Sequence, residues 1–294
     1  MNRRNLFFFI LLIFQRQVYG EGFSSLKLGG DARASALGMA YTAVSDDGSA
    51  GYWNPAGLAL LRKQDFIFSI HRWMIDTRGE FVGFGWGGDN TGIGVHILHT
   101  EVADFEYRIV PSPDPLFLFS IHELIAGVSY GRIVRNKISI GITFKLLYEK
   151  IFTEETIGLG ADLGILWQVW EDGLRIGGVL QHVGKTTLLK NEDIPLPVTA
   201  RFGLALPVRI FQNHSLFVLD GVKERGFPFH LHGGIEFGWW DRLFLRLGYQ
   251  TEYKIHNITG GMGVTWRQYR LNYSYTPYRS GMGDSHHLSI GITI

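Results

Sequence analysis

The sequence contains no cysteine among its 294 residues. This absence excludes disulfide bonds, thiolate metal sites, cysteine nucleophiles and attachment of a lipid to an N-terminal cysteine. Charged residues make up only 19% of the chain, which is below the roughly 25% of soluble proteins. The 28 basic and 27 acidic residues nearly balance, so the chain gives no electrostatic reason to expect nucleic acid as a partner.

The chain also lacks an apolar run of the roughly 20 residues that a membrane helix needs. Its longest run, residues 6–14, follows Arg3 and Arg4 and precedes Val18 and Gly20, which place small residues before a cleavage site. This order is typical of a secretory signal peptide, so we predict a signal at residues 1–20. A buried N-terminal helix is the alternative.

Glycine and aromatic residues are what the chain has in excess. It contains 38 glycines, nearly twice the usual share of about 7%, and its aromatic content is 14%. Low charge with many glycines and rings suits strands that face lipid on one side and a packed lumen on the other.

The last eight residues alternate between apolar and polar or glycine, as a strand with two different faces does. Leu288, Ile290, Ile292 and Ile294 share the apolar face. A soluble protein rarely ends on such a strand, because its free edge pairs with other chains. A closed barrel pairs its last strand with its first. We therefore expect this closing strand to pair with the strand near Phe66 and to face lipid.

The same alternation recurs along residues 62–294. Its clearest segments are 138–148, 157–169, 200–208, 243–249, 258–266 and 271–275. With weaker segments the count is about fourteen, and single-chain outer-membrane barrels have an even number of antiparallel strands. Several apolar faces end in Trp or Tyr, which suits the membrane boundary. The pattern predicts an all-β, transmembrane antiparallel barrel, and a secreted β-sandwich is the alternative.

The connections between these segments fall into two classes. Tight turns are predicted at residues 135–136 and 171–173, and longer loops at 100–115, 150–156 and 184–197. Short turns on one side and longer loops on the other are the asymmetry of outer-membrane barrels. We expect the longer loops on the outer surface, and a compact outer end without long insertions.

Residues 21–61 differ from the rest of the chain, because they are rich in small residues and show no alternation. Asn54 is a good N-cap and Pro55 suits a first helical position, so a short helix is predicted to begin at Pro55. Small side chains suit a segment that threads into a narrow space.

This segment carries a family resemblance. It resembles the N-terminal signature of PorV/PorQ-type proteins, which lie in the wider FadL-like group of outer-membrane proteins. The residues that carry the resemblance are Gly30-Asp31-Ala32-Arg33, Ala36-Leu37-Gly38-Met39-Ala40, Thr42-Ala43, Asp46-Asp47 and Trp53-Asn54-Pro55-Ala56-Gly57-Leu58-Ala59, with further matches at 180–184, 195–203 and 286–291. One departure is the final Ile294, where such barrels usually end on Phe.

The resemblance implies a fourteen-stranded barrel over residues 62–294 with residues 21–61 inside it as a hatch. The candidate hatch residues are Asp46, Asp47, Tyr52, Trp53, Asn54, Pro55, Ala56 and Gly57. Polar residues of both signs lie at inward positions of the predicted strands, so they do not form the single-sign ring of an ion filter. We expect a salt-bridge network around the hatch from Lys145, Asp162, Arg175, Arg201, Glu236, Arg246 and Arg270.

No motif carries convincing catalytic chemistry. Residues 83–88 match G-x-G-x-x-G, but another strand begins at Thr91, where a dinucleotide site needs a helix. His230 and His232 share one strand face, but no third ligand is tied to them by spacing. The chain is therefore predicted to be non-enzymatic, with no catalytic residue, no cofactor and no metal.

Two functions follow from the resemblance. PorV/PorQ members serve type IX secretion, so the first hypothesis is a secretion accessory whose partners are secretion-system or cargo proteins. FadL-like members pass hydrophobic small molecules, so the alternative is a passive path for a hydrophobic ligand, with an apolar pocket against Tyr52 and Trp53. Both place the exported protein in the outer-membrane lipid of a Gram-negative-type bacterium.

Overall fold

The computed structural model of this protein describes residues 22–73, 77–111, 113–189, 194–210, 213–251, 257–278 and 283–294. The predicted signal peptide, residues 1–20, lies outside these ranges. None of the helices within them is long and apolar enough to cross a membrane.

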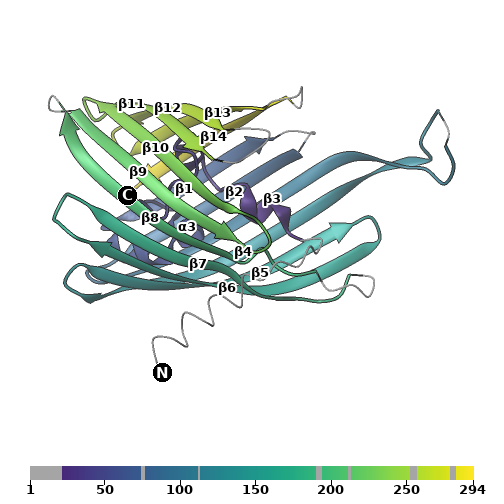
Figure 1. Cartoon of the computed structure of the whole chain (residues 1–294), viewed down its shortest axis with the longest axis horizontal. Helices are drawn as coiled ribbons and strands as arrows, with labels where there is room; N and C mark the ends of the chain where they lie inside the picture. Colours follow the sequence, from purple (N-terminus) through teal and green to yellow (C-terminus); the bar gives the residue numbers. More distant parts are fainter. Residues whose placement is uncertain are drawn as a thin grey trace.

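Antiparallel strands form one closed barrel in which each strand pairs with its neighbours in the sequence (Figure 1). The described residues give fourteen strands, so the predicted fold class is confirmed. The strands are β1 (Gln64–Arg72), β2 (Thr77–Gly87), β3 (Thr91–Tyr107), β4 (Phe117–Arg135), β5 (Ile138–Ile151), β6 (Glu154–Gln168), β7 (Arg175–Thr186), β8 (Thr199–Ile210), β9 (Asn213–Glu224), β10 (Phe229–Trp239), β11 (Leu243–Gln250), β12 (Ile258–Trp266), β13 (Tyr269–Pro277) and β14 (Asp284–Thr293).

The pairing of β1 with β14 closes the barrel. Phe68 lies opposite Ile290, and Ile70 lies opposite Leu288. Leu288 and Ile290 are both exposed on the outer face, Ile292 is partly exposed, and Ile294 follows the end of the strand. The last strand therefore pairs with the strand that contains Phe66, as predicted.

Each strand sorts its side chains onto two faces, because successive residues point to opposite sides. Along β11, Leu245 and Leu247 are exposed on the outside, whereas Arg246 and Gln250 are buried. The outer surface consequently carries exposed aliphatic and aromatic residues on strand after strand, while Ser, Thr, His and charged residues gather inside.

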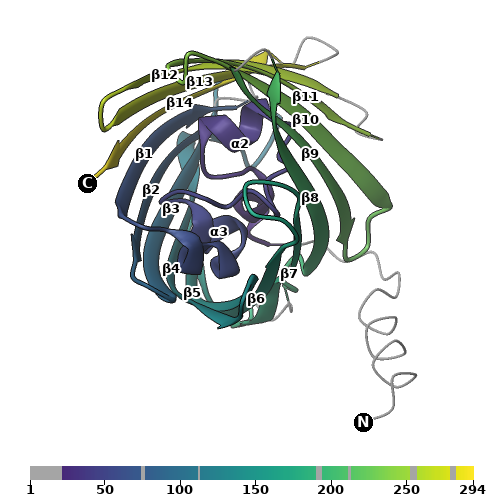
Figure 2. The same cartoon turned by 90° about the vertical axis from the view of Figure 1, so that its left-hand side faces the viewer.

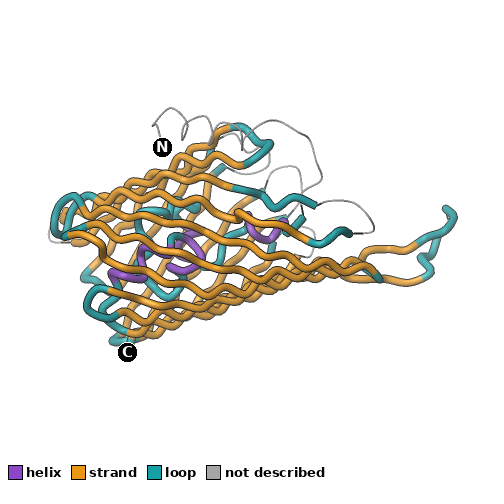
Figure 3. The backbone as a smooth tube through the Cα atoms, turned by 90° about the horizontal axis from the view of Figure 1, so that it is seen from below, coloured by secondary structure: helices purple, strands orange, loops and turns teal. Residues whose placement is uncertain are grey.

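The connections define two ends of the barrel. At the C-terminal end, where β14 finishes, the turns at 88–90, 136–137, 240–242 and 267–268 have two or three residues each. At the opposite end, which we call the hairpin end, β3 and β4 run past the other strands as one protruding hairpin (Figure 3).

Three expectations about the connections are wrong. Residues 100–107 belong to β3, which continues past a register shift between Val102 and Phe105. Residues 150–156 contain only a two-residue turn, because β5 ends at Ile151 and β6 begins at Glu154. The protruding hairpin contradicts a compact outer end. The register shift interrupts the alternation of apolar and polar residues, so the sequence pattern did not indicate that the strand continues beyond it.

The N-terminal segment lies inside the barrel (Figure 2). We call residues 22–61 the hatch. Its described helices are η1 (Ser24–Lys27), α2 (Ala32–Ala36), α3 (Ala50–Trp53) and η2 (Pro55–Leu60). The last of these begins at Pro55 as predicted, with the Asn54 side chain accepting a hydrogen bond from the Ala56 N–H.

Inward glycines let the hatch backbone approach the wall closely. A Cβ at Gly248 would lie 2.1 Å from the backbone nitrogen of Gly38, and a Cβ at Gly141 would lie 2.3 Å from the carbonyl carbon of Pro55. Any side chain at either wall position would push the hatch away. Part of the glycine excess is therefore explained by the space that the hatch occupies.

Candidate functional site

Polar side chains of the wall hold the hatch by its backbone. Asp220 on β9 accepts hydrogen bonds from the N–H groups of Tyr41 and Thr42, at 3.2 and 3.1 Å, and from the Thr42 hydroxyl. On β11, the Gln250 amide donates to the carbonyl of Gly38 at 2.9 Å. A buried backbone group without a partner is costly, so these wall residues replace the ladder partners that an irregular segment lacks.

Asn54 joins the hatch to itself and to the wall. Its Oδ1 accepts from the Ala56 N–H at 3.2 Å, and its Nδ2 donates to the carbonyls of Thr42 and Ile165 at 2.9 and 3.2 Å. The side chain is completely buried. Both halves of the amide are therefore used, and no solvent can replace a lost partner.

We expect Asn54→Ala to loosen the hatch by about 2–4 kcal/mol, because it removes a helix cap and leaves buried carbonyls without donors. Hydrogen exchange of residues 50–60 measures this as faster exchange. The matched control is Asn90→Ala, the same truncation at an exposed turn, which should leave the exchange unchanged. Equal exchange in the two variants would contradict the assigned role.

Tyr52 and Trp53 fill the middle of the lumen. Their ring centroids lie 5.4 Å apart edge to face, and Tyr52 makes a similar contact with Phe81 at 5.6 Å. Trp53 Nε1 donates to Asp31 at 2.8 Å, and the Tyr52 hydroxyl donates to the Leu26 carbonyl at 3.2 Å. Both rings are buried, so they block the lumen rather than line an open pocket.

The seven predicted lumen residues point inward, and each has an oppositely charged partner within 4 Å. They form four separate groups instead of one network. The groups are Lys145–Asp162 at 2.6 Å, Arg201–Asp220 at 3.3 Å, Arg270–Asp65 at 2.7 Å, and the chain Arg246–Glu236–Arg33–Asp46–Arg175, whose pairs measure 2.6, 2.9, 2.8 and 3.5 Å. Only the last group joins more than two charged residues.

Arg33, Asp65 and Asp220 are partners that the sequence reasoning missed. Arg33 bridges the hatch to β10 through Glu236. Asp65 accepts hydrogen bonds from the Gly48 N–H of the hatch and from Arg270. Asp65 and Asp220 are carboxylates at inward positions of mostly apolar stretches, and the alternation of the sequence could have identified them.

Asp46 and Asp47 are neighbours in the hatch with opposite electrostatics. Burial opposes ionisation of Asp46, but the guanidinium groups of Arg33 and Arg175 outweigh it and lower the pKa of this carboxyl below its usual value. Burial, together with the carboxylate of Asp31, raises the pKa of Asp47 to about 6. The contributions of the two carboxyls to the stability of the hatch therefore depend on pH in opposite directions.

Because the pKa of Asp47 is raised in the folded protein, this carboxyl stabilises the hatch fully below about pH 4, the pKa of an aspartate in the unfolded chain. This stabilisation is lost as the pH rises through about 6. The lowered pKa of Asp46 has the opposite effect: this carboxylate stabilises the hatch at pH values above the usual aspartate pKa, and the stabilisation is lost on acidification. We expect Asp47→Asn to slow hydrogen exchange of the hatch at about pH 7.5 and to change little at about pH 4. Asp46→Asn should accelerate exchange at the higher pH. The same profile for both variants would contradict these assignments.

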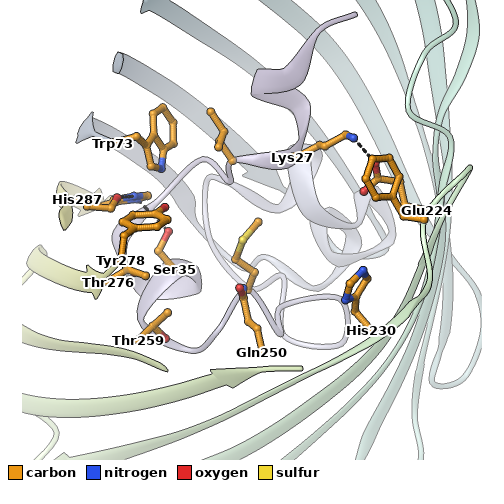
Figure 4. A pocket seen from close by; sticks show the side chains of 14 residues that line it. Lys27, Ser35, Trp73, Glu224, His230, Gln250, Thr259, Thr276, Tyr278 and His287 are labelled. Carbon is orange, nitrogen blue, oxygen red and sulfur yellow. Dashed lines mark hydrogen bonds and ion pairs between the residues drawn. The ribbon is translucent and has the colours of Figure 1, made fainter. Parts of the chain in front are cut away.

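A cavity of about 240 Å³ lies at the hairpin end between the hatch and the wall (Figure 4). Leu28 and Met39 of the hatch supply apolar lining, with Trp73 after β1 and Phe227 after β9. The remaining lining residues are Lys27, Ser35, Glu224, His230, Gln250, Thr259, Thr276, Tyr278, Ser285 and His287. A cavity of about 150 Å³ is enough to bind benzene, so this one admits a molecule built on a single ring.

The hairpin-end cavity is not the pocket expected against Tyr52 and Trp53. A space of about 40 Å³ touches these two rings, and it shares Lys27, Met39 and Glu224 with the larger cavity. The larger cavity lies nearer the hairpin end, because the two rings themselves occupy the middle of the lumen.

A second, charged cavity opens at the C-terminal end. It measures about 970 Å³, and its lining includes Arg33, Asp46, Arg175 and Glu236. It shares no lining residue with the hairpin-end cavity. The hatch therefore separates an aromatic-lined cavity at one end from a charged vestibule at the other.

The histidine pair and the glycine motif have ordinary structural places. His230 lines the hairpin-end cavity, with its Nδ1 3.0 Å from the Thr251 carbonyl. Within the described ranges, no group of three or more His, Asp or Glu side chains is arranged to hold a metal ion. Residues 83–88 lie in β2 and its turn, and β3 follows, so the helix that a dinucleotide site needs after this motif is a strand here.

The sequence matches one family model, and the barrel resembles several solved structures. Residues 13–107 match the family model described as Uncharacterised protein family (UPF0164). No curated protein matches the sequence.

Solved structures resemble the whole barrel. The Pseudomonas putida toluene transporter TodX is 14% identical over 96% of this chain and 98% of its own, with a TM-score of 0.64. CymD, a monoaromatic hydrocarbon channel, is 12% identical over 90% and 97%, with a TM-score of 0.62. A FadL homologue of Pseudomonas aeruginosa is 10% identical over 90% and 98%, with a TM-score of 0.59. At these identities the likeness is one of fold, and the FadL-like part of the resemblance is confirmed at that level.

Proposed function

We propose that this protein is an outer-membrane channel that passes small hydrophobic molecules. Its exposed outer side chains form the apolar surface that lipid requires, and its inner face is polar. Outer-membrane barrels have short turns on the periplasmic side, so the hairpin end faces outward in this proposal. Export through a signal peptide at residues 1–20 belongs to the same proposal.

The cavity at the hairpin end is the observation that carries this function. Trp73, Phe227 and Met39 of the hatch line it, and Figure 4 shows Trp73 on the side opposite Glu224. Methionine is flexible and fits varied apolar shapes. A ring-sized hydrophobic molecule is removed from water there, which provides the driving force for capture. TodX and CymD, which are described as a toluene transporter and a monoaromatic hydrocarbon channel, support this ligand class.

Passage requires a movement of the hatch, because the hatch separates the two cavities. The captured molecule occupies the hairpin-end cavity first. A shift of the segment around Met39 and Trp53 then connects it with the charged vestibule. That vestibule carries the charged side chains of Arg33, Asp46, Arg175 and Glu236, so a hydrophobic molecule is held less tightly there and leaves.

Filling the cavity tests the proposal. Met39→Trp places a large ring in the space, and we expect at least 10-fold lower uptake of radiolabelled toluene by cells that depend on this barrel. The matched control is Met262→Trp, the same change on the exposed outer face of β12, which should keep normal uptake. Equal uptake by the two variants would overturn the proposal.

The protruding hairpin favours a second candidate function, a secretion accessory that docks proteins as PorV/PorQ members do. The side chains at its tip are strongly exposed: Ile109 by 74%, and Val110 and Leu116 by 63% each. Stacked rings continue along the hairpin, with Tyr107 and Phe117 at 4.6 Å. Exposed apolar patches of this kind mark interaction sites.

Cross-linking in native membranes separates the two functions. A photoreactive residue at position 110 should capture a secreted protein or a secretion component, and the Ile109→Ser, Leu116→Ser variant should reduce capture several-fold. Leu247→Ser on the outer wall is the control. Recovery of no secretion partner or cargo protein would reject the secretion function and leave the channel proposal intact.

A further inference from the structure

The hairpin-end cavity has a polar side that a pure hydrocarbon does not use. Figure 4 shows Thr276, Tyr278, Ser35 and His287 gathered on one side of the cavity. Thr276 and Ser285 lie directly opposite each other on β13 and β14. Both side chains are buried and line the cavity, so two hydroxyl-bearing side chains form a small polar patch on its wall.

His287 fixes the arrangement behind this patch. Its Nδ1 lies 2.9 Å from Ser35 Oγ and 2.9 Å from His71 Nδ1, and its Nε2 lies 2.9 Å from Ser285 Oγ. Both ring nitrogens are therefore engaged, and His287 stands edge to face against Trp73 at 5.3 Å. Ser285 is held in one place by this bond, next to the aromatic lining.

The Thr276 hydroxyl is part of the cavity lining and makes no hydrogen bond with another residue in the part of the chain that the structure describes. Its position on β13 is inward and 6% exposed. Covering such a hydroxyl with an apolar molecule is unfavourable, because the hydroxyl then has no hydrogen-bond partner. A ligand with a hydrogen-bonding group gives Thr276 a partner, whereas a hydrocarbon covers the hydroxyl and leaves it without one.

The opposite side of the cavity presents no unbalanced charge. Lys27 forms an ion pair with Glu224, and its ammonium lies 4.2 Å from the centroid of the Phe227 ring. A carboxylate ligand would have to compete with Glu224 for Lys27. The lining therefore favours a neutral ligand over an anionic one.

We infer that the preferred ligand is a neutral molecule with a ring-sized apolar body and one hydrogen-bonding group, as in a phenol, directed at Thr276 and Ser285. This inference rests on the proposed channel function and makes it more specific. The apolar body lies between Trp73 and Phe227, and the hydroxyl of the ligand completes the hydrogen bonding of Thr276. Sites that hydrogen-bond a substrate hydroxyl discriminate against the analogue without it.

Three related compounds test the inference by equilibrium binding to the purified full-length protein in detergent. Toluene, p-cresol and p-toluate share one ring and one methyl group and differ in having no polar group, a hydroxyl or a carboxylate. We expect p-cresol to bind about 5-fold to 10-fold tighter than toluene, and p-toluate to bind more weakly than p-cresol. Thr276→Val keeps the side-chain shape and should abolish the preference by weakening p-cresol alone.

The matched control is Thr265→Val, the same change at an inward-side position of β12 near the C-terminal end, which should keep the preference. Equal affinity for toluene and p-cresol, or a preference that survives Thr276→Val, would overturn the inference while the channel function stands. Tightest binding of p-toluate would overturn the neutral-ligand part. Binding of none of the three compounds would overturn the channel proposal and the inference together.

Discussion

Cross-linking the hatch to the barrel wall is expected to abolish passage of small hydrophobic molecules. A Cβ at Gly51 would lie 3.1 Å from the Cβ of Ser129 on β4. Disulfides join Cβ atoms about 3.5–4.5 Å apart, so a shift of a few tenths of an ångström allows the double variant Gly51→Cys, Ser129→Cys to form one. The natural chain has no cysteine, so this bond would be the only disulfide present.

The effect should be large, because in the proposed channel function the two cavities connect only when the hatch moves. We expect uptake of toluene, or of p-cresol, to fall at least 10-fold in the oxidised double variant and to recover after reduction with dithiothreitol. Ser129→Cys alone serves as the control and should transport normally under both conditions. Transport that is unaffected by oxidation, with the disulfide verified by mass spectrometry, would show that molecules pass without this movement.

The barrel could be predicted from the sequence because its physical cause is local. Residues such as Leu245 and Leu247 face outward and Arg246 faces inward by the geometry of a strand alone. The closing pair of β1 and β14 follows from the same argument, since an apolar edge needs a partner. The start of η2 at Pro55 follows from the capping preference of Asn54.

The partners inside the lumen could not be predicted, because they depend on distances across the barrel. Arg33 and Glu236 are 203 positions apart in the sequence but make two hydrogen bonds. The alternation shows that Glu236 points inward without showing what it meets there. The predicted position of the ligand cavity, against Tyr52 and Trp53, was wrong for a related reason. Aromatic residues fill a lumen as readily as they line one.

The protruding hairpin was missed for a local reason. Asp104 has a left-handed backbone with φ of 62°, at the register shift in β3. A shift of this kind changes which residues share a face. Residues 105–107, which follow the shift, were therefore predicted to be part of a loop, although they pair with β4 as far as Tyr107 and Phe117.

Loss of the Asp220 carboxylate is expected to release the hatch without opening the barrel. This carboxylate receives the N–H groups of Tyr41 and Thr42 and pairs with Arg201. Arg201 is itself only 8% exposed, and removing one partner of a buried ion pair costs about 3–5 kcal/mol. The ladder between β8 and β9 is made by backbone groups, so the wall remains closed.

We therefore expect Asp220→Ala to raise the uptake of a hydrophobic dye that the intact barrel excludes by at least 10-fold. The variant should keep the heat-modifiable gel mobility of a folded barrel. Asp162→Ala is a demanding control, because it breaks another buried ion pair, with Lys145 at 2.6 Å, that lies between wall strands. Increased dye uptake by both variants alike would mean that any buried charge defect opens the lumen.

A double variant decides whether Asp220 acts through its charge or through its hydrogen bonds. Asp220→Asn keeps an oxygen acceptor for Tyr41 and Thr42 but leaves the Arg201 guanidinium without a counter-charge. Adding Arg201→Met removes that orphan charge and also the bond from Arg201 to the Met39 carbonyl. If the charge dominates, the double variant should hold the hatch better than Asp220→Asn alone. If the hydrogen bonds dominate, Asp220→Asn should already resemble the natural protein, and the second change should weaken it.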